Sequence, residues 1–180
     1  MPTQPSEQQV NEIGRQLAVM NIKNGMDIMA KCFHLEPVMH TSGELLSVLR
    51  DSGFTSAAWN DEKYAIIKWS DWLEIIRADW TDHRKWIRDT FDCDNFSLAF
   101  LSHNAEMFRV NSAGVASGQI YDKNTGKLIG GHWWTAIVAY DGGKMCLFFY
   151  EPITDEWVKY SGKEIIMGDW KYQPNWFLFS

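Results

Sequence analysis

A buried strand, a tight turn and a second strand in the C-terminal half constrain the fold more than any other feature. Residues 133–140 are all apolar, β-branched or aromatic, which is typical of a central strand. Asp141-Gly142-Gly143-Lys144 then predicts a hairpin turn, and residues 145–150 predict the partner strand. Residues 64–69, 117–121, 157–160 and 172–179 also have strand-like patterns. The sequence therefore predicts an antiparallel hairpin at the centre of a larger sheet.

The predicted hairpin brings two polar residues together. If the turn is centred between Asp141 and Gly142, His132 lies directly opposite Glu151. Side chains that face each other across an antiparallel pair are roughly 5 Å apart. A carboxylate at that distance can orient an imidazole and stabilise its protonated form. The spacing alone thus predicts a His132–Glu151 pair.

Helical patterns occur before the hairpin. From about Glu7, apolar side chains recur at helical spacing, and a second helical piece is expected from Met26 to Phe33. A short helix is expected after Thr41 or Ser42. Another is expected after Ser70, with Leu73, Ile76 and Trp80 on its buried face. The apolar residues of the first stretch are Val10, Ile13, Leu17 and Met20. The small residues from 114 to 118 predict a loop. Helices and an antiparallel sheet together predict an α+β fold.

Cys93 is the candidate nucleophile. Residues 96–108 are compatible with a helix, and Asp92 is a plausible N-cap, so Cys93 would lie in the first turn. The helix dipole there favours the thiolate, which is the reactive form of cysteine. With His132 as general base and Glu151 orienting the ring, Cys93 would complete a Cys-His-acid triad. The alternative is that Cys93 is a small buried hydrophobe, which is common for cysteine.

Three short motifs follow one another along the chain: Asp92-Cys93-Asp94-Asn95-Phe96, Gly131-His132-Trp133, and Tyr150-Glu151-Pro152 followed by Thr154 and Glu156. Together they resemble the C-terminal domain of the Marasmius oreades agglutinin family and its small standalone relatives from bacteria and phages. The resemblance extends over residues 64–179. It implies a papain-like fold, a cysteine protease triad formed by Cys93, His132 and Glu151, and dependence on calcium.

The residues beside Cys93 also suggest a metal site. Asp92 and Asp94 would oppose formation of the thiolate by like-charge repulsion, and a bound divalent cation would reverse that effect. Hard oxygen ligands suit Ca²⁺, and Asn95 can add a carbonyl oxygen. We therefore expect Asp92, Asp94 and Asn95 to bind Ca²⁺ or another divalent cation. The alternative is that Asp92 only caps the helix and Asp94 is solvated.

The composition limits the kinds of partner that the protein is expected to bind. The chain of 180 residues has a formal net charge of −6, which argues against nucleic-acid binding. Ten Trp residues predict an aromatic cleft, where a peptide or amide substrate would bind. The start of the chain lacks a signal-peptide pattern, and no apolar run is long enough to span a membrane. We therefore expect a cytoplasmic or virion-associated protein; the oligomeric state is left open.

These observations lead to one functional prediction and one alternative. We predict a helical extension at residues 1–60, with a nucleophile helix packed on the sheet of a papain-like catalytic domain at residues 61–180. Its predicted function is that of a cysteine peptidase or amidase. Asn60 and Gln119 are both candidates for the second oxyanion donor that such an enzyme needs. The alternative is a non-catalytic binding or structural module, of phage or bacterial origin, that keeps the fold.

Overall fold

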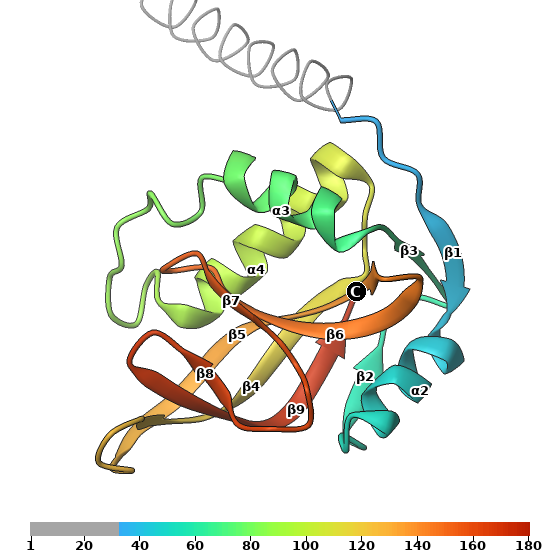
Figure 1. Cartoon of the computed structure of the whole chain (residues 1–180). Coiled ribbons are helices and arrows are strands. Elements are labelled where there is room, and N and C mark those ends of the chain that lie inside the picture. The colour runs from blue at the N-terminus through green and yellow to red at the C-terminus, as the bar shows by residue number, and fades with distance from the viewer. Residues whose placement is uncertain (1–32) are drawn as a thin grey trace, which may run out of the picture.

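The computed structural model describes residues 33–180. The predicted apolar stripe from Val10 to Met20 lies outside these residues. Within them the fold is α+β, as predicted, with helices packed against a mainly antiparallel sheet (Figure 1). No helix between residues 33 and 180 is long and apolar enough to cross a membrane.

A seven-stranded sheet forms the centre of the molecule. Its order is β2-β9-β4-β5-β6-β7, and β8 pairs with β9. Every pairing in it is antiparallel except that of β2 with β9. The strands are β2 (Ala57–Trp59), β4 (Ala113–Asp122), β5 (Leu128–Asp141), β6 (Lys144–Glu151), β7 (Glu156–Lys159), β8 (Ile165–Met167) and β9 (Trp170–Phe179). A separate pair joins β1 (Val38–Thr41) to β3 (Lys63–Ile66).

Two apolar clusters bury the two faces of this sheet. On one face, α3 (Trp69–Ala78) and α4 (Cys93–His103) pack over β5 and β6 (Figure 1). On the other, α2 (Ser42–Asp51) packs with side chains from β4, β5, β6 and β9. Residues 33–60 therefore contribute to the same core as the later strands. The division of the chain at residue 60 stays a prediction.

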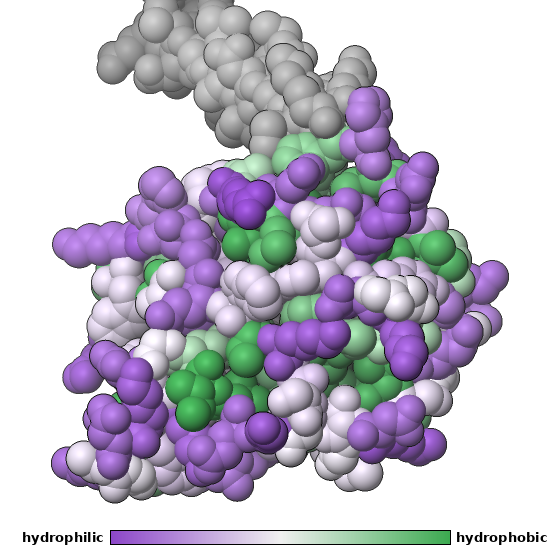
Figure 2. Space-filling view, in the orientation of Figure 1, coloured by the Kyte–Doolittle hydropathy of each residue, from purple (hydrophilic) through white to green (hydrophobic). Residues whose placement is uncertain are grey.

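The surface is mixed in character. Figure 2 shows hydrophobic residues reaching this face in separate patches, with hydrophilic side chains between them. Ten large hydrophobic side chains in the described part are exposed, among them Val38, Met39 and Trp157. Single exposed apolar residues are ordinary in soluble domains, so a functional argument needs a cavity as well.

The central hairpin is confirmed, but its predicted register is wrong. Gly142 and Gly143 both have positive φ, at 59° and 79°, and they form a two-residue turn closed by the pair Asp141–Lys144. This is the turn geometry that suits the twist of a hairpin, and glycine adopts it without strain. Centring the turn on the two glycines shifts Glu151 by two residues relative to His132. Because side chains alternate with a period of two, this shift keeps both on one face of the sheet.

The predicted loop from Gly114 to Gly118 is wrong, because these residues belong to the first part of β4. Their small size has a packing reason. A Cβ atom on Gly114 would lie 2.5 Å from the Leu178 carbonyl oxygen, and one on Gly118 would lie 2.0 Å from the Gln173 carbonyl oxygen. Glycine therefore allows the backbones of β4 and β9 to approach closely. The small residues from 114 to 118 suggested a loop because the sequence did not show that β9 would pair with them.

The helix predicted to follow an N-cap at Ser70 exists, but it begins two residues earlier and ends sooner than predicted. Trp69 is its first residue and Ala78 its last. Trp80 lies beyond its end, where the side chain is 51% exposed, so the prediction that it is buried is wrong. Instead the Trp80 ring stacks on His103 at 4.8 Å.

Candidate functional site

The candidate site lies where β5 has a free edge. The pairing of β5 with β6 ends at Thr135–Tyr150, whereas its pairing with β4 continues to Leu128. The residues of β5 before Thr135 therefore have no β6 neighbour. Helix α4 begins next to this part of β5, because Cys93 and His132 line one pocket.

The start of α4 follows the sequence prediction. Asp92 is the N-cap with extended backbone angles, and Cys93 is the first helical residue. The Asp92 N–H donates to Asn95 Oδ1 at 3.3 Å, and the Asn95 N–H donates to Asp94 Oδ1 at 2.9 Å. These bonds use backbone groups that a helix start otherwise leaves unpaired. The local sequence thus holds Cys93 at the positive end of the helix dipole.

The structure brings Cys93, His132 and Glu151 together. His132 Nε2 lies 2.6 Å from Glu151 Oε2, and Cys93 lines the same pocket as His132. His132 and Glu151 are both buried, since His132 is 7% exposed and Glu151 is 1% exposed. The structure therefore brings the three predicted residues together, although the hairpin register that supported the His132–Glu151 pair was wrong.

The environment of His132 favours its protonated form. Burial by itself lowers the pKa of an imidazole, but the hydrogen bonds with Cys93 and Glu151 and their negative charges outweigh it. They raise the pKa of His132 from 6.5 to about 9. At neutral pH the arrangement therefore holds an imidazolium between a carboxylate and a sulfur atom.

Tyr172 and three further contacts were not foreseen from the sequence. The Tyr172 hydroxyl donates to Glu151 Oε2 at 3.0 Å, and the Ile153 N–H donates to Glu151 Oε1 at 3.2 Å. The rings of Trp134 and Trp170 lie 6.1 Å and 5.6 Å from that of His132. The excess of Trp in the sequence was a signal, but it could not assign any single ring to the site.

The open side of the site is a shallow pocket of about 310 Å³. Asp92, Cys93 and Asp94 from the start of α4 form one wall, and Trp133 and His132 from β5 form the other. Ser117, Gly118 and Gly131 complete the lining. Neither Asn60 nor Gln119, the two predicted oxyanion donors, lines this pocket; the Gln119 side chain accepts from the Tyr121 hydroxyl instead.

Asp92 and Asp94 flank Cys93 in the sequence, and both line the pocket with it. A hydrogen bond between the two carboxyl groups lowers the pKa of Asp92 and raises the pKa of Asp94 above its ordinary value. Two carboxylates this close share a proton, or they share a cation. The Oδ1 atom of Asn95 is already an acceptor in the helix cap. Between residues 33 and 180, no cluster of three or more His, Cys, Asp or Glu side chains has metal-binding geometry.

Comparisons with known proteins place the fold. No model of a protein family matches the chain, and no curated protein does. Among solved structures, the PSL1a–E64 complex aligns with a TM-score of 0.54 at 21% identity, over 78% of this chain and 51% of that one. Polyporus squamosus lectin, bound to the human-type influenza-binding epitope Neu5Acα2-6Galβ1-4GlcNAc, aligns with a TM-score of 0.52 at 16% identity, over 78% and 49%. The chain thus spans about half the length of these structures.

These comparisons contradict the prediction of a cysteine peptidase or amidase. The structural neighbours are lectins, and a peptide substrate finds no support among them. The pocket agrees with this correction, because neither predicted oxyanion donor reaches it. The assignment as a thiol hydrolase is therefore wrong, although its three residues do meet. At these identities, what the chain demonstrably shares with the lectin structures is the fold.

Proposed function

We propose that the protein is a carbohydrate-binding module whose pocket beside Cys93 and His132 holds one sugar ring. The observation that carries the proposal is the pocket lining, which combines the acidic residues Asp92 and Asp94 with the aromatic residue Trp133. Carboxylates accept hydrogen bonds from sugar hydroxyls, and an aromatic ring packs against the apolar face of a sugar. The likeness in fold to Polyporus squamosus lectin supports this choice of ligand.

The size of the pocket suits a small ligand. Its volume of about 310 Å³ is near the lower end of the range for ligand sites, ~300–1,000 Å³. The buried His132–Glu151 pair behind it supplies a rigid polar wall, because both of its groups are hydrogen-bonded to other side chains. Such a wall orients a ligand without having to rearrange when it binds.

The charge of the pocket favours a neutral glycan. Asp92 and Asp94 stand at its mouth, and the positive charge of His132 is already paired with Glu151. Without bound calcium, a sialic acid carboxylate would be repelled by the aspartates, and no Lys or Arg lines this pocket to pair with it. We therefore expect Galβ1-4GlcNAc to bind better than the same disaccharide capped with Neu5Acα2-6.

Isothermal titration of the full chain with the two glycans tests this proposal. Trp133→Ala should weaken binding of the neutral disaccharide roughly three- to tenfold, because an aromatic contact contributes about 0.5–1.5 kcal/mol. Asp94→Asn should weaken it as well, since a charged acceptor is replaced by a neutral one. Trp157→Ala is the matched control, because that exposed tryptophan does not line the pocket.

Two results would reject the proposal. One is that neither glycan binds at millimolar concentration. The other is binding that Trp157→Ala weakens and Trp133→Ala leaves unchanged, which would move the sugar away from this pocket.

We also propose that the fold is papain-like and that the chain is related to the C-terminal domain of the Marasmius oreades agglutinin family. Support comes from the meeting of Cys93, His132 and Glu151 at the start of a helix that packs on an antiparallel sheet. An experimental structure of the chain would test this directly. Superposition on a papain-like domain that failed to align α4 and β5 together would reject it.

Calcium binding by Asp92 and Asp94 is a further part of the proposal. The two carboxyl groups are close enough to shift each other's pKa, so a cation bound between them would relieve their repulsion. Because Asn95 Oδ1 serves in the helix cap, the remaining ligands would be water or sugar hydroxyls. Terbium(III), a luminescent stand-in for calcium, should emit when Trp133 nearby is excited, and calcium should displace it. Emission that persists unchanged in Asp94→Asn would place the cation elsewhere.

A further inference from the structure

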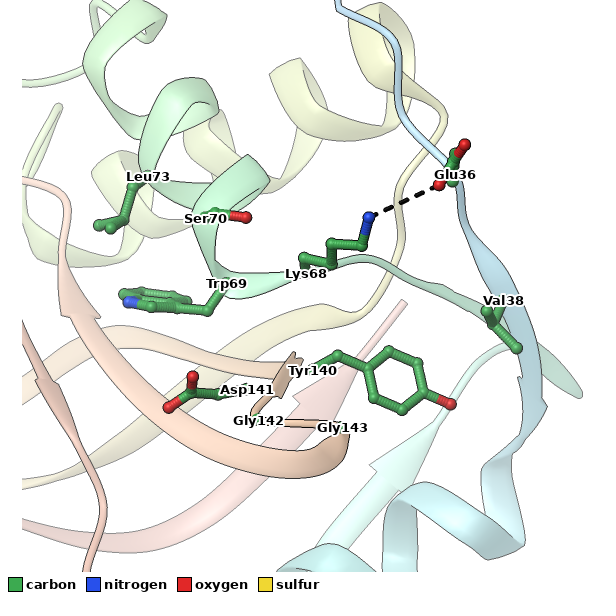
Figure 3. A pocket seen from close by; sticks show the side chains of 10 residues that line it. All are labelled: Glu36, Val38, Lys68, Trp69, Ser70, Leu73, Tyr140, Asp141, Gly142 and Gly143. Atoms are coloured by element: carbon green, nitrogen blue, oxygen red, sulfur yellow. Dashed lines mark ion pairs between the residues drawn. The ribbon is translucent and has the colours of Figure 1, made fainter.

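Figure 3 shows the residues that line a second cavity, of about 640 Å³. It includes Tyr140 and Asp141, at the opposite end of β5 from His132. Val38 from β1, Trp69 and Leu73 from α3, and Tyr140 from β5 line it. The nine steps along the strand from His132 to Asp141 measure about 30 Å, so this cavity is separate from the proposed sugar site. Nothing in the proposed function uses it.

The polar groups around the cavity already have partners. The Tyr140 hydroxyl contacts His40 Nε2 at 2.6 Å, and the Asp141 carboxylate binds Lys159 Nζ at 2.6 Å. Figure 3 shows Lys68 reaching across to Glu36, and their charged atoms are 3.5 Å apart. The cavity therefore has no unpaired charge in its described lining to attract an ionic ligand. What it offers is apolar surface, and that surface suits apolar side chains.

The chain itself supplies a candidate occupant close by. The described part begins at Phe33, whose ring packs on Phe108 at 4.8 Å. Glu36 and Val38, a few residues later, line the cavity. The five steps from Phe33 to Val38 span at most about 17 Å of extended chain. The point where the preceding segment joins Phe33 therefore lies within about that distance of a residue that lines the cavity. A tethered segment also has an effective concentration on the order of millimolar, which no free partner matches easily.

The sequence before Phe33 has the required chemistry. Its apolar residues recur at helical spacing, and Glu7, Glu12 and Asp27 balance Arg15, Lys23 and Lys31 in charge. A neutral segment meets no net repulsion from Glu36 or Asp141. The apolar residues at helical spacing are Val10, Ile13, Leu17 and Met20. We propose that this stripe, from the same chain, docks into the cavity between α3, β1 and the β5–β6 turn.

Photo-crosslinking in the full chain tests the docking. Ser70 is exposed and lines the cavity, so p-benzoylphenylalanine placed there should crosslink to peptides from residues 1–32. The same group at Ile166, which is exposed on β8, is the control. We expect at least roughly tenfold more of this crosslink from position 70, as follows for a tethered segment held against one site. A mixture of isotope-labelled and unlabelled chains distinguishes crosslinks within one chain from those between two.

A pair of variants tests which side chains dock. Leu17→Asp should reduce the crosslink from position 70 by roughly tenfold or more, because burying an unpaired carboxylate is costly. Gln16→Asp introduces the same charge off the stripe and should leave the crosslink unchanged. Crosslinks that join labelled to unlabelled chains would assign the cavity to a second copy and overturn the proposal. An absence of crosslinks to residues 1–32, or a signal that Leu17→Asp leaves intact, would overturn it too.

Discussion

Glu151 is the residue on which the candidate site depends. It is almost completely buried, and both of its carboxylate oxygens accept hydrogen bonds, from His132 and Tyr172 at one and from the Ile153 N–H at the other. A buried carboxylate is destabilising unless it is paired in this way. The contacts of Glu151 therefore hold His132 in place, and His132 in turn lines the pocket.

Removing the Tyr172 hydroxyl should destabilise the protein. In Tyr172→Phe, Glu151 Oε2 loses a buried donor, and we expect the free energy of unfolding to fall by about 1–3 kcal/mol. Urea unfolding followed by fluorescence measures the change. Tyr121→Phe is the matched control, because that hydroxyl bonds to Gln119 in an exposed position. Equal losses in the two variants would show that burial of the hydrogen bond has no effect.

The raised pKa of His132 predicts how stability depends on pH. The unfolded chain has the ordinary value of 6.5, and the folded protein has a pKa of about 9. Below 6.5 both states hold the proton and the stabilisation is complete, whereas it disappears as pH rises through 9. We expect the difference in unfolding free energy between the wild type and His132→Gln to shrink by roughly 1–3 kcal/mol over this range. A difference that is constant with pH would contradict the assigned protonation state.

At the scale of elements, the close contact of β4 with β9 positions the pocket. Gly118 lines the pocket on β4, and it also faces the backbone of Gln173 on β9. The strand that pairs with β5 is therefore held by a contact that leaves no room for a side chain. Any increase in residue size at this point would move β4, and with it the wall beneath Trp133 and His132.

Gly118→Ala should be strongly destabilising. Its Cβ would lie 2.0 Å from the Gln173 carbonyl oxygen, which is backbone and cannot turn away. We expect a loss of about 1–3 kcal/mol or more, the range for overpacking a tight site. Gly130→Ala is the control, since a Cβ there meets nothing within 4 Å. Thermal or urea unfolding of the two variants gives the comparison, and similar midpoints would refute the packing argument.

At the scale of the whole molecule, β9 joins β2 to the rest of the seven-stranded sheet. β9 lies between β2 and β4, and both clusters of buried side chains rest on the sheet that it completes. Phe177 and Phe179 from β9 are fully buried. The pairing of β9 with β2 joins residues far apart in the sequence, so the sheet is complete only when the C-terminal strand is present.

Truncation after Gly168 should therefore abolish cooperative folding. The shortened chain lacks β9, which leaves β2 and β4 unpaired on that side and exposes the apolar side chains that β9 covers. Near-ultraviolet circular dichroism and urea unfolding should show no cooperative transition. Deletion of Ser180 alone, which is exposed, should leave the transition unchanged. A cooperative transition in the truncated chain near the wild-type midpoint would contradict this view of the fold.

Local patterns in the sequence determined much of this protein. The hairpin of β5 and β6, the cap at Asp92 and the helix from Cys93 depend on residues near one another in the chain, so propensity and hydrogen bonding predict them. The closeness of His132 and Glu151 was also predicted, and it survived the error in register because a shift of two residues leaves side chains on the same face of the sheet.

Other features were decided only by the tertiary structure. Gly114 to Gly118 became a strand because β9, more than fifty residues later, lies against them. Tyr172, which also lies on β9, reaches Glu151 only through this packing. Neither predicted oxyanion donor lines the pocket. Packing between distant segments depends on which surfaces meet, and the sequence of one segment does not identify the segment that will pack against it. The candidate site shows the same contrast. Local sequence predicted its polar residues, whereas tertiary packing decided which other residues surround them.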